Sequence, residues 1–128
     1  MSKIIGVEKV SRYKWIDKYF LAKKGVTKNY QPDWEAFQFK IKDKLVAYTG
    51  DYKDRPIITL KGEPFQNEIL RQKYEDITAG YHMNKNWWNT VYLDGKVPEK
   101  VIKEMIDVSY ELILGAFAKK IREEISKA

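Results

Sequence analysis

The residues with the most varied chemistry lie in one stretch, residues 79–93, with the sequence AGYHMNKNWWNTVYL. It contains the chain's only histidine, two adjacent tryptophans, and a cluster of amide and ammonium side chains. Aromatic rings can stack on a nucleobase or grip a peptide, and ammonium and amide groups can contact phosphate. From this stretch we predict five nucleic-acid-binding residues: Tyr81, His82, Asn84, Lys85 and Trp88.

The histidine and the tryptophan pair each allow a structural interpretation. His82 would either donate or stack at a ligand surface, or bond to a backbone carbonyl while partly buried. A lone histidine lacks the base and the orienting partner that catalysis requires, which favours the structural role. Trp87 and Trp88 are neighbours on an extended segment, so they point to opposite faces. We expect one ring in the core and the other either under the last helix or exposed.

A second set of candidates is basic. Lys40, Lys42 and Lys44 surround the tip of a predicted hairpin, and Lys14 and Lys18 fall on the outer face of the first predicted helix. Ammonium groups on a loop can reach phosphates without reading bases. The alternative is a solvated turn whose charges keep a sheet edge from pairing.

The charge distribution is uneven along the chain. The 128 residues carry a net charge of +6, and residues 1–62 hold 14 Lys and Arg against 7 Asp and Glu, whereas residues 63–128 hold 10 against 11. Such a field attracts polyanions. On charge alone, the simpler explanation that a lysine-rich small domain is soluble is favoured over a nucleic-acid partner.

Several kinds of chemistry are hard to build from these residues. With no cysteine there is no thiolate nucleophile, disulfide or cysteine-ligated zinc. No serine lies in a nucleophile context, no acidic cluster accompanies His82, and no glycine-rich loop opens a helix. We therefore predict a protein that is not an enzyme, with no catalytic residues, no metal site and no cofactor.

The chain length and its apolar runs predict one soluble domain covering residues 1–128. No run approaches the ~20 apolar residues of a membrane span, and the N-terminus lacks a signal-peptide pattern, so we expect a cytoplasmic protein with no membrane partner. Residues 1–10 are expected to be a lead-in. Residues 116–128 are expected to be a helical extension that could support a weak homodimer through Phe117, Ile121 and Ile125, the alternative being a monomer.

The first half of the chain predicts a helix and then an antiparallel sheet. Residues 11–24 have an aromatic stripe and end at Gly25, which suits the left-handed position after a helix. Alternation of Phe37, Phe39 and Ile41 predicts a strand over 36–41. Further strands are expected over 26–30, 45–49 and 56–60, with a charged loop at 50–55.

The second half predicts two helices separated by extended segments. Pro64 suits the first turn of a helix reaching about residue 74, with Phe65 and Ile69 facing inward. Extended segments follow at about 77–83 and 87–93. Pro98 starts a long helix with an apolar stripe that includes Met105 and Val108. The predicted fold is α+β, an antiparallel sheet with helices packed on one face and a long C-terminal helix.

Three sequence segments resemble the signature of the MmcQ/YjbR family. They are the run GYHMNK at 80–85, the pair Trp87-Trp88 with NTV at 89–91, and LDGKVP at 93–98. The segment MIDVSYEL at 105–112 is similar to that family's C-terminal element.

The resemblance implies a compact α+β fold likened to the double-wing DNA-binding domain of the phage factor MotA and to the frataxin-like CyaY. The first comparison implies that the sheet and its hairpin wings meet double-stranded DNA. The second implies an acidic helix that binds iron, but the first helix here has Asp17 as its one acid among five Lys and Arg. The alternative partner is a protein, bound chaperone-like through an exposed aromatic patch.

Overall fold

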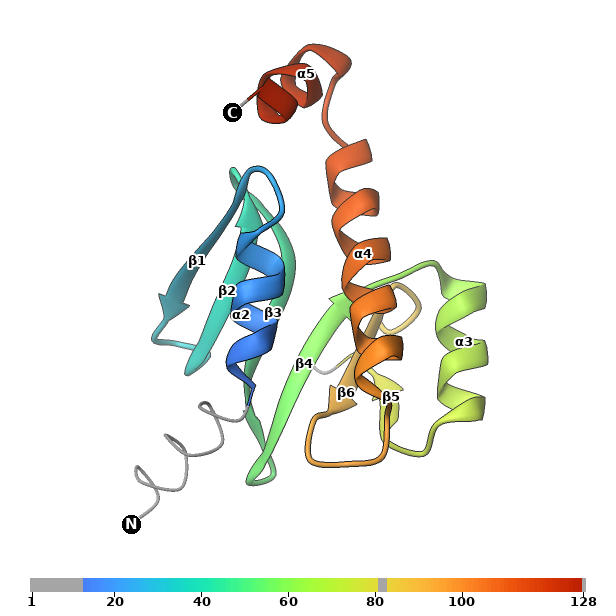
Figure 1. Cartoon of the computed structure of the whole chain (residues 1–128). Coiled ribbons are helices and arrows are strands. Elements are labelled where there is room, and N and C mark those ends of the chain that lie inside the picture. Colours follow the sequence, from blue (N-terminus) through green and yellow to red (C-terminus); the bar gives the residue numbers. More distant parts are fainter. Residues whose placement is uncertain (1–12, 81–82, 128) are drawn as a thin grey trace.

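The computed structural model describes residues 13–80 and 83–127, which form four helices and six strands (Figure 1). The α+β prediction is confirmed. The expected lead-in at 1–10 and the helix start at Ser11 lie outside the described residues. In order, the elements are α2 (Lys14–Leu21), β1 (Val26–Gln31), β2 (Ala36–Ile41), β3 (Lys44–Tyr52), β4 (Arg55–Lys61), α3 (Pro64–Lys73), β5 (Ile77–Ala79), β6 (Trp88–Tyr92), α4 (Glu99–Gly115) and α5 (Lys119–Lys127).

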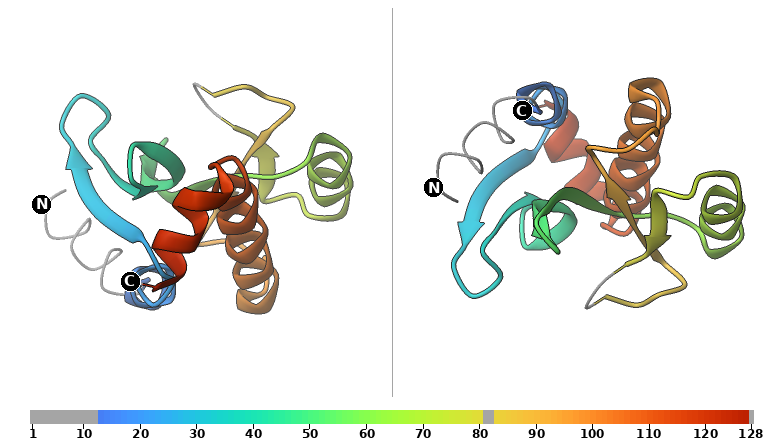
Figure 2. Two further views of the ribbon diagram at one scale, coloured as in Figure 1. Left: turned by 90° about the horizontal axis from the view of Figure 1, so that it is seen from above. Right: turned by 90° about the horizontal axis from the view of Figure 1, so that it is seen from below.

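The six strands form one antiparallel sheet in the order β1-β2-β3-β4-β6-β5. Helices α2 and α4 lie on the same side of this sheet, and α3 lies beside the β5–β6 edge (Figure 2). We call the side under α2 and α4 the helix face and the other side the open face. Since side chains alternate along a strand, each strand contributes to both faces.

The hairpin β2–β3 follows the predicted alternation. Phe39 and Ile41 are fully buried on the helix face, and the pairing shifts register at Phe39 and Lys40. Residues 42–43 make the reversal, with Lys42 at a φ of 53°. The lysines of the tip therefore extend from one end of the sheet.

The predicted charged loop over 50–55 is wrong. Strands β3 and β4 continue through it and pair as far as Tyr52 and Arg55, which leaves a two-residue turn. Lys53 and Asp54 have φ values of 52° and 62°, the two left-handed residues that a type I′ hairpin turn requires. Asparagine and glycine usually fill these positions, so the sequence lacked the common turn signal.

The apolar core lies between the sheet and the helix face. Phe20 of α2 stacks on Phe39 with ring centroids 4.5 Å apart, and Ile106 of α4 is fully buried. Buried Ser109 connects α4 to the sheet through hydrogen bonds. Its hydroxyl donates to the Val46 carbonyl at 2.8 Å. It also accepts the Lys61 backbone N–H at 3.1 Å. Val108, predicted on the inward stripe, is 47% exposed because the stripe is centred on Ile102, Met105, Ile106, Ser109 and Ile113.

Helix α3 is turned away from its predicted orientation. Phe65 and Ile69 are 68% and 40% exposed, whereas Asn67 is 2% exposed. The Asn67 side-chain amide donates to the backbone carbonyls of Gly62 at 2.9 Å and Asn86 at 3.1 Å. Polar bonds, rather than an apolar stripe, decide which side of this helix faces the protein.

The C-terminal extension is helical, as predicted, but folds back on the chain. Helix α4 ends at Gly115, a short break follows, and α5 crosses toward the end of α2 (Figure 1). Phe117 and Ile125 are 8% and 6% exposed, so both side chains are already packed within the chain. Gly25 has a φ of +83°, and a Cβ there would lie 2.8 Å from Ile125 Cγ2. No helix among the described residues is long and apolar enough to cross a membrane.

Candidate nucleic-acid interface

The hairpin tip, the C-terminal end of α2 and the end of α5 meet at one end of the molecule (Figure 1). The Lys24 ammonium donates to the Ser126 carbonyl at 2.6 Å, and the Lys44 ammonium lies 5.5 Å from the Phe117 ring centroid. We call Lys24, Lys42 and Lys44 the basic end. Two separate segments, the end of α2 and the hairpin β2–β3, thus bring cations to one region beside α5.

The basic end keeps most of its charge available to a ligand. Its three lysines are exposed, and none of them takes part in the ion pairs formed between described residues. Asp43, between Lys42 and Lys44, offsets one of the three charges. The neighbouring Lys23 differs, because it pairs with Asp107 at 2.6 Å.

The outer side of α2 adds two cations. Lys14 and Lys18 are exposed, and residues four apart share one helix side. The acid between them, Asp17, is held by an ion pair with Lys28 of β1. Lys14 and Lys18 therefore extend a positive surface along α2, which ends at the basic end.

Two predicted lysines do not join this surface. Lys40 lies between the inward-facing Phe39 and Ile41, so it belongs to the open face. Lys85 lies in the β5–β6 connection, at the other edge of the sheet from the hairpin β2–β3. The predicted lysines therefore do not form one continuous surface beside β6. They are Lys14, Lys18, Lys40, Lys42, Lys44 and Lys85.

The tryptophan pair has one buried and one exposed member, as predicted, but Trp88 is not the exposed one. Trp88 is 7% exposed, which removes its ring from any ligand surface, and Trp87 is 38% exposed. The cause is close packing at the start of β6: Gly80 N–H donates to the Trp88 carbonyl at 2.7 Å. A Cβ on Gly80 would lie 2.6 Å from Trp88 Cβ. The exposed ring, Trp87, has the Lys61 ammonium 5.4 Å from its centroid.

The asparagines of the same stretch have structural partners. The Asn84 side chain accepts the Asn86 backbone N–H at 3.0 Å, which stabilises its own turn. Buried Asn89 donates to the Asn67 carbonyl at 3.2 Å and accepts from Arg71 at 2.7 Å. Sequence reasoning missed Asn67 and Arg71, since their partners are distant in the chain. Tyr81 and His82 lie outside the described residues.

Titratable groups at the opposite end of the sheet form a structural network. Arg55 binds Asp94 at 2.8 Å and Asp76 at 3.3 Å, and its guanidinium lies 4.0 Å from the Tyr92 ring centroid. The Lys96 backbone N–H, donating at 2.9 Å, is the main cause that lowers the pKa of Asp76, and the Arg55 guanidinium adds to it. Hydrogen bonds to Asp94 and Asp76 raise the pKa of Arg55.

A second network joins α2 to α4. Burial opposes the charge of Asp107, but hydrogen bonds from Lys23 and Tyr19 hold its pKa below the ordinary value. The bond to Asp107 raises the pKa of Tyr19. Within residues 13–80 and 83–127, no three His, Asp or Glu side chains are grouped to hold a metal ion.

Comparison with known proteins supports the resemblance. The family model described as YjbR matches residues 21–112. The Escherichia coli K12 protein YjbR is 40% identical over 93 residues, covering 73% of this chain and 79% of the relative. The protein YbdF of Escherichia coli O157:H7 is 31% identical over 87 residues, covering 68% of this chain and 71% of YbdF. Neither name states an activity.

Two crystal structures share the fold. Protein DR2400 of Deinococcus radiodurans, a DUF419 domain, has a TM-score of 0.80 and 32% identity, covering 87% of this chain and 85% of its own. A Pseudomonas syringae protein has a TM-score of 0.66 and 30% identity, covering 80% of this chain and 97% of its own.

Proposed function

This chain belongs to the MmcQ/YjbR family, and from that premise we propose that it is a non-enzymatic cytoplasmic protein that binds double-stranded DNA. The contact surface is the basic end together with Lys14 and Lys18 of α2. The observation that carries the proposal is the meeting of Lys24, Lys42 and Lys44, exposed and outside the ion pairs of the described residues, at one end of the sheet.

The expected mode of binding is contact with the phosphate backbone. A hairpin tip and a helix side can both follow a duplex, and each ammonium that neutralises a phosphate releases a counterion. The ring next to the basic end, Phe117, is buried, and so is Trp88, so neither can stack on a base. The proposal therefore predicts affinity that depends strongly on salt and weakly on DNA sequence.

The non-enzymatic part of the proposal rests on the roles of the shifted groups. The described groups with shifted pKa values are Tyr19, Arg55, Asp76, Asp107 and Tyr110. The first four share two ion-pair networks that join structural elements, and the Tyr110 hydroxyl donates to the Lys24 carbonyl at 2.7 Å. None of them is paired with a nucleophilic hydroxyl in the manner of an acyl-transfer site.

The test is fluorescence anisotropy with a labelled DNA duplex at low ionic strength. The double variant Lys42→Glu with Lys44→Glu is expected to lower the affinity by roughly tenfold to a hundredfold, because two attractive contacts become repulsive. The matched control is Lys100→Glu, which changes an exposed lysine near the start of α4, away from the basic end.

Two outcomes contradict the DNA proposal. One is wild-type protein with no measurable affinity even at low salt. The other is an equal loss of binding free energy per reversed lysine in Lys100→Glu and in the double variant, which would indicate attraction by net charge without a defined surface.

A second candidate function is binding of a protein partner. It is favoured by the apolar side chains that are exposed near α3. Phe65 and Ile69 are one helical turn apart on the outer side of α3. Trp87 lies beside Gly62, just before this helix, since Gly62 N–H donates to the Trp87 carbonyl at 2.8 Å. Apolar side chains exposed together are a common feature of interaction sites.

The two functions separate in one capture experiment. A partner held by the apolar edge remains bound after nuclease treatment and high salt, is lost from Trp87→Ala or Phe65→Ser, and is retained by Lys42→Glu. If nuclease treatment releases the captured partner, the result contradicts this candidate function and agrees with DNA binding.

A further inference from the structure

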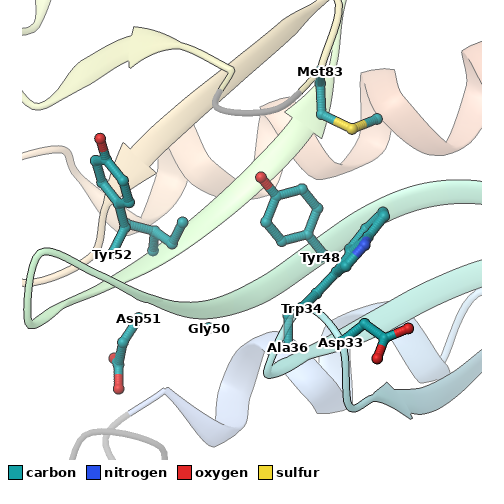
Figure 3. Close-up of a pocket in the computed structure, with 9 residues that line it drawn as sticks. Asp33, Trp34, Ala36, Tyr48, Gly50, Asp51, Tyr52 and Met83 are labelled. Carbon is teal, nitrogen blue, oxygen red and sulfur yellow. The ribbon is translucent and has the colours of Figure 1, made fainter.

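A cavity of about 470 Å³ opens on the open face of the sheet, away from the basic end (Figure 3). Its floor consists of Ala36, Gly50 and Ile57, from three neighbouring strands. Gly50 pairs with Ile57 across β3 and β4, and a Cβ on Gly50 would lie 3.3 Å from Ala36 Cβ. Because Ala36 and Gly50 are small, they leave a gap between the larger side chains of the open face.

The walls of the cavity are aromatic. Tyr48 and Tyr52 stand two positions before and after Gly50 on β3, so both share its face. Trp34, from the β1–β2 turn, packs edge-on against Tyr48 with ring centroids 5.4 Å apart and stays 47% exposed. Met83 completes the lining from the β5–β6 connection (Figure 3).

The charged side chain beside the cavity is a carboxylate. Asp33, in the β1–β2 turn, is an exposed lining residue that takes no part in the ion pairs formed between described residues. Asp51 also borders the cavity, but it alternates with Gly50 and Tyr52 along β3 and points its carboxylate to the other side of the sheet (Figure 3). No lysine or arginine is among the described lining residues. Next to the aromatic wall, the Lys53 ammonium lies 5.2 Å from the Tyr52 ring centroid.

We propose that this cavity binds the alkylammonium group of a small organic cation. The negative faces of aromatic rings attract a cation, most strongly where water is excluded, and quaternary ammonium groups are recognised in this way. The carboxylate of Asp33 adds long-range attraction beside the cavity. The cavity volume lies within the range of about 300–1,000 Å³ that is usual for small-molecule sites.

The lining disfavours the other ligand classes. A phosphate or carboxylate ligand would meet the Asp33 carboxylate with no cation among the described lining residues. A neutral apolar ligand could enter, but it would gain nothing from Asp33. The preference for a cation over a neutral molecule of the same shape is therefore the property that defines the site.

The experiment is an NMR titration of ¹⁵N-labelled full chain with choline, compared with its neutral carbon isostere dimethylbutanol at matched ionic strength. Choline is expected to shift the indole N–H of Trp34 and the backbone amides of Tyr48 and Gly50. The isostere is expected to bind roughly tenfold more weakly, since it lacks the cation–π and carboxylate attraction. Equal affinity for both, shifts confined to other regions, or no shift with choline would each overturn the proposal.

Variants localise the effect. Gly50→Leu fills the floor and is expected to abolish the choline shifts, with circular dichroism as the check of folding. Asp33→Asn leaves the cavity open and is expected to lower the affinity roughly twofold to fivefold, as for a solvent-exposed charge. Asp43→Asn, the same change at the hairpin tip, is the control and is expected to have no effect. An unchanged affinity in Asp33→Asn, or an equal change in Asp43→Asn, contradicts the assignment.

Discussion

The two ends of the sheet are stabilised in different ways. At the basic end, Phe117 and Ile125 are buried, and the glycine that ends α2 lies directly against Ile125. At the other end, the turn β3–β4 and the connection from β6 to α4 are joined by Arg55 with Asp76 and Asp94. We call this second region the ion-pair end. One end is held by apolar packing and the other by charges.

This difference bears on function. Because buried apolar side chains anchor the basic end, we expect Lys42 and Lys44 to contribute little to folding and to be available for a ligand, whereas Lys24 also donates to the Ser126 carbonyl. At the ion-pair end, the Arg55 guanidinium and the Asp76 carboxylate already bind each other, so they are poor candidates for ligand contacts. Charged residues that the fold does not use are therefore the better guide to a binding surface.

The largest expected effect comes from removing an apolar anchor at the basic end. Phe117→Ala should lower the free energy of unfolding by about 3 kcal/mol, because a buried ring is replaced by a cavity. Val108→Ala, at an exposed position of α4, should change it by less than about 0.5 kcal/mol. Urea unfolding measures both. A small loss for Phe117→Ala would show that apolar packing does not hold this end.

The next effect concerns a glycine of the ion-pair end. In Gly95→Ala the new Cβ would lie 2.2 Å from Asp76 Oδ2, so the carboxylate must move away from Lys96 and Arg55. We expect a loss of about 2 kcal/mol. Gly115→Ala is the control: it meets no atom within 4 Å and should stabilise α4 by roughly 0.5–1 kcal/mol. Thermal unfolding of the two variants should thus shift in opposite directions.

The ion-pair end should also be sensitive to acid. The pKa of Asp76 is lowered on folding, so its charge stabilises the protein above the ordinary value of 3.8, and this contribution is lost as the pH falls through the folded value. Asp76→Asn should cost about 1 kcal/mol at pH 7. The difference from wild type should shrink as the pH is lowered below about 4. A difference that persists at low pH would assign the effect to packing.

The smallest expected effect on stability is at the hairpin tip. Lys42→Glu with Lys44→Glu should change the free energy of unfolding by less than about 0.5 kcal/mol, since both side chains are exposed. Urea unfolding at moderate salt is the measurement. A larger loss would mean that these lysines serve the fold, and the contrast between the two ends would fail.

Much of the fold could be predicted from local signals. The alternation of Phe37, Phe39 and Ile41 identified β2, Pro64 and Pro98 marked helix starts, and Gly25 marked a helix end. The turn at 53–54 was missed because neither of its left-handed residues is glycine or asparagine. The orientation of α3 was missed because Asn67 faces inward through hydrogen bonds to distant backbone groups.

The candidate site was less accessible to sequence reasoning. The hairpin lysines were found because consecutive exposed charges at a reversal are a local pattern. Trp88 was predicted as a binding residue, and its burial could not be foreseen because the contact of Gly80 with Trp88 depends on the pairing of separate segments. The open-face cavity draws Ala36, Gly50, Ile57 and Met83 from separate segments, so no contiguous motif indicates it.

The most direct test of the proposed function is the salt dependence of DNA binding. The logarithm of the association constant is measured against the logarithm of the salt concentration for wild type and for Lys42→Glu with Lys44→Glu. If both lysines neutralise phosphates, the wild-type slope is steeply negative, and the variant's slope is shallower by about 2 units. Parallel lines for the two proteins would contradict the assignment of the basic end as the DNA-binding surface.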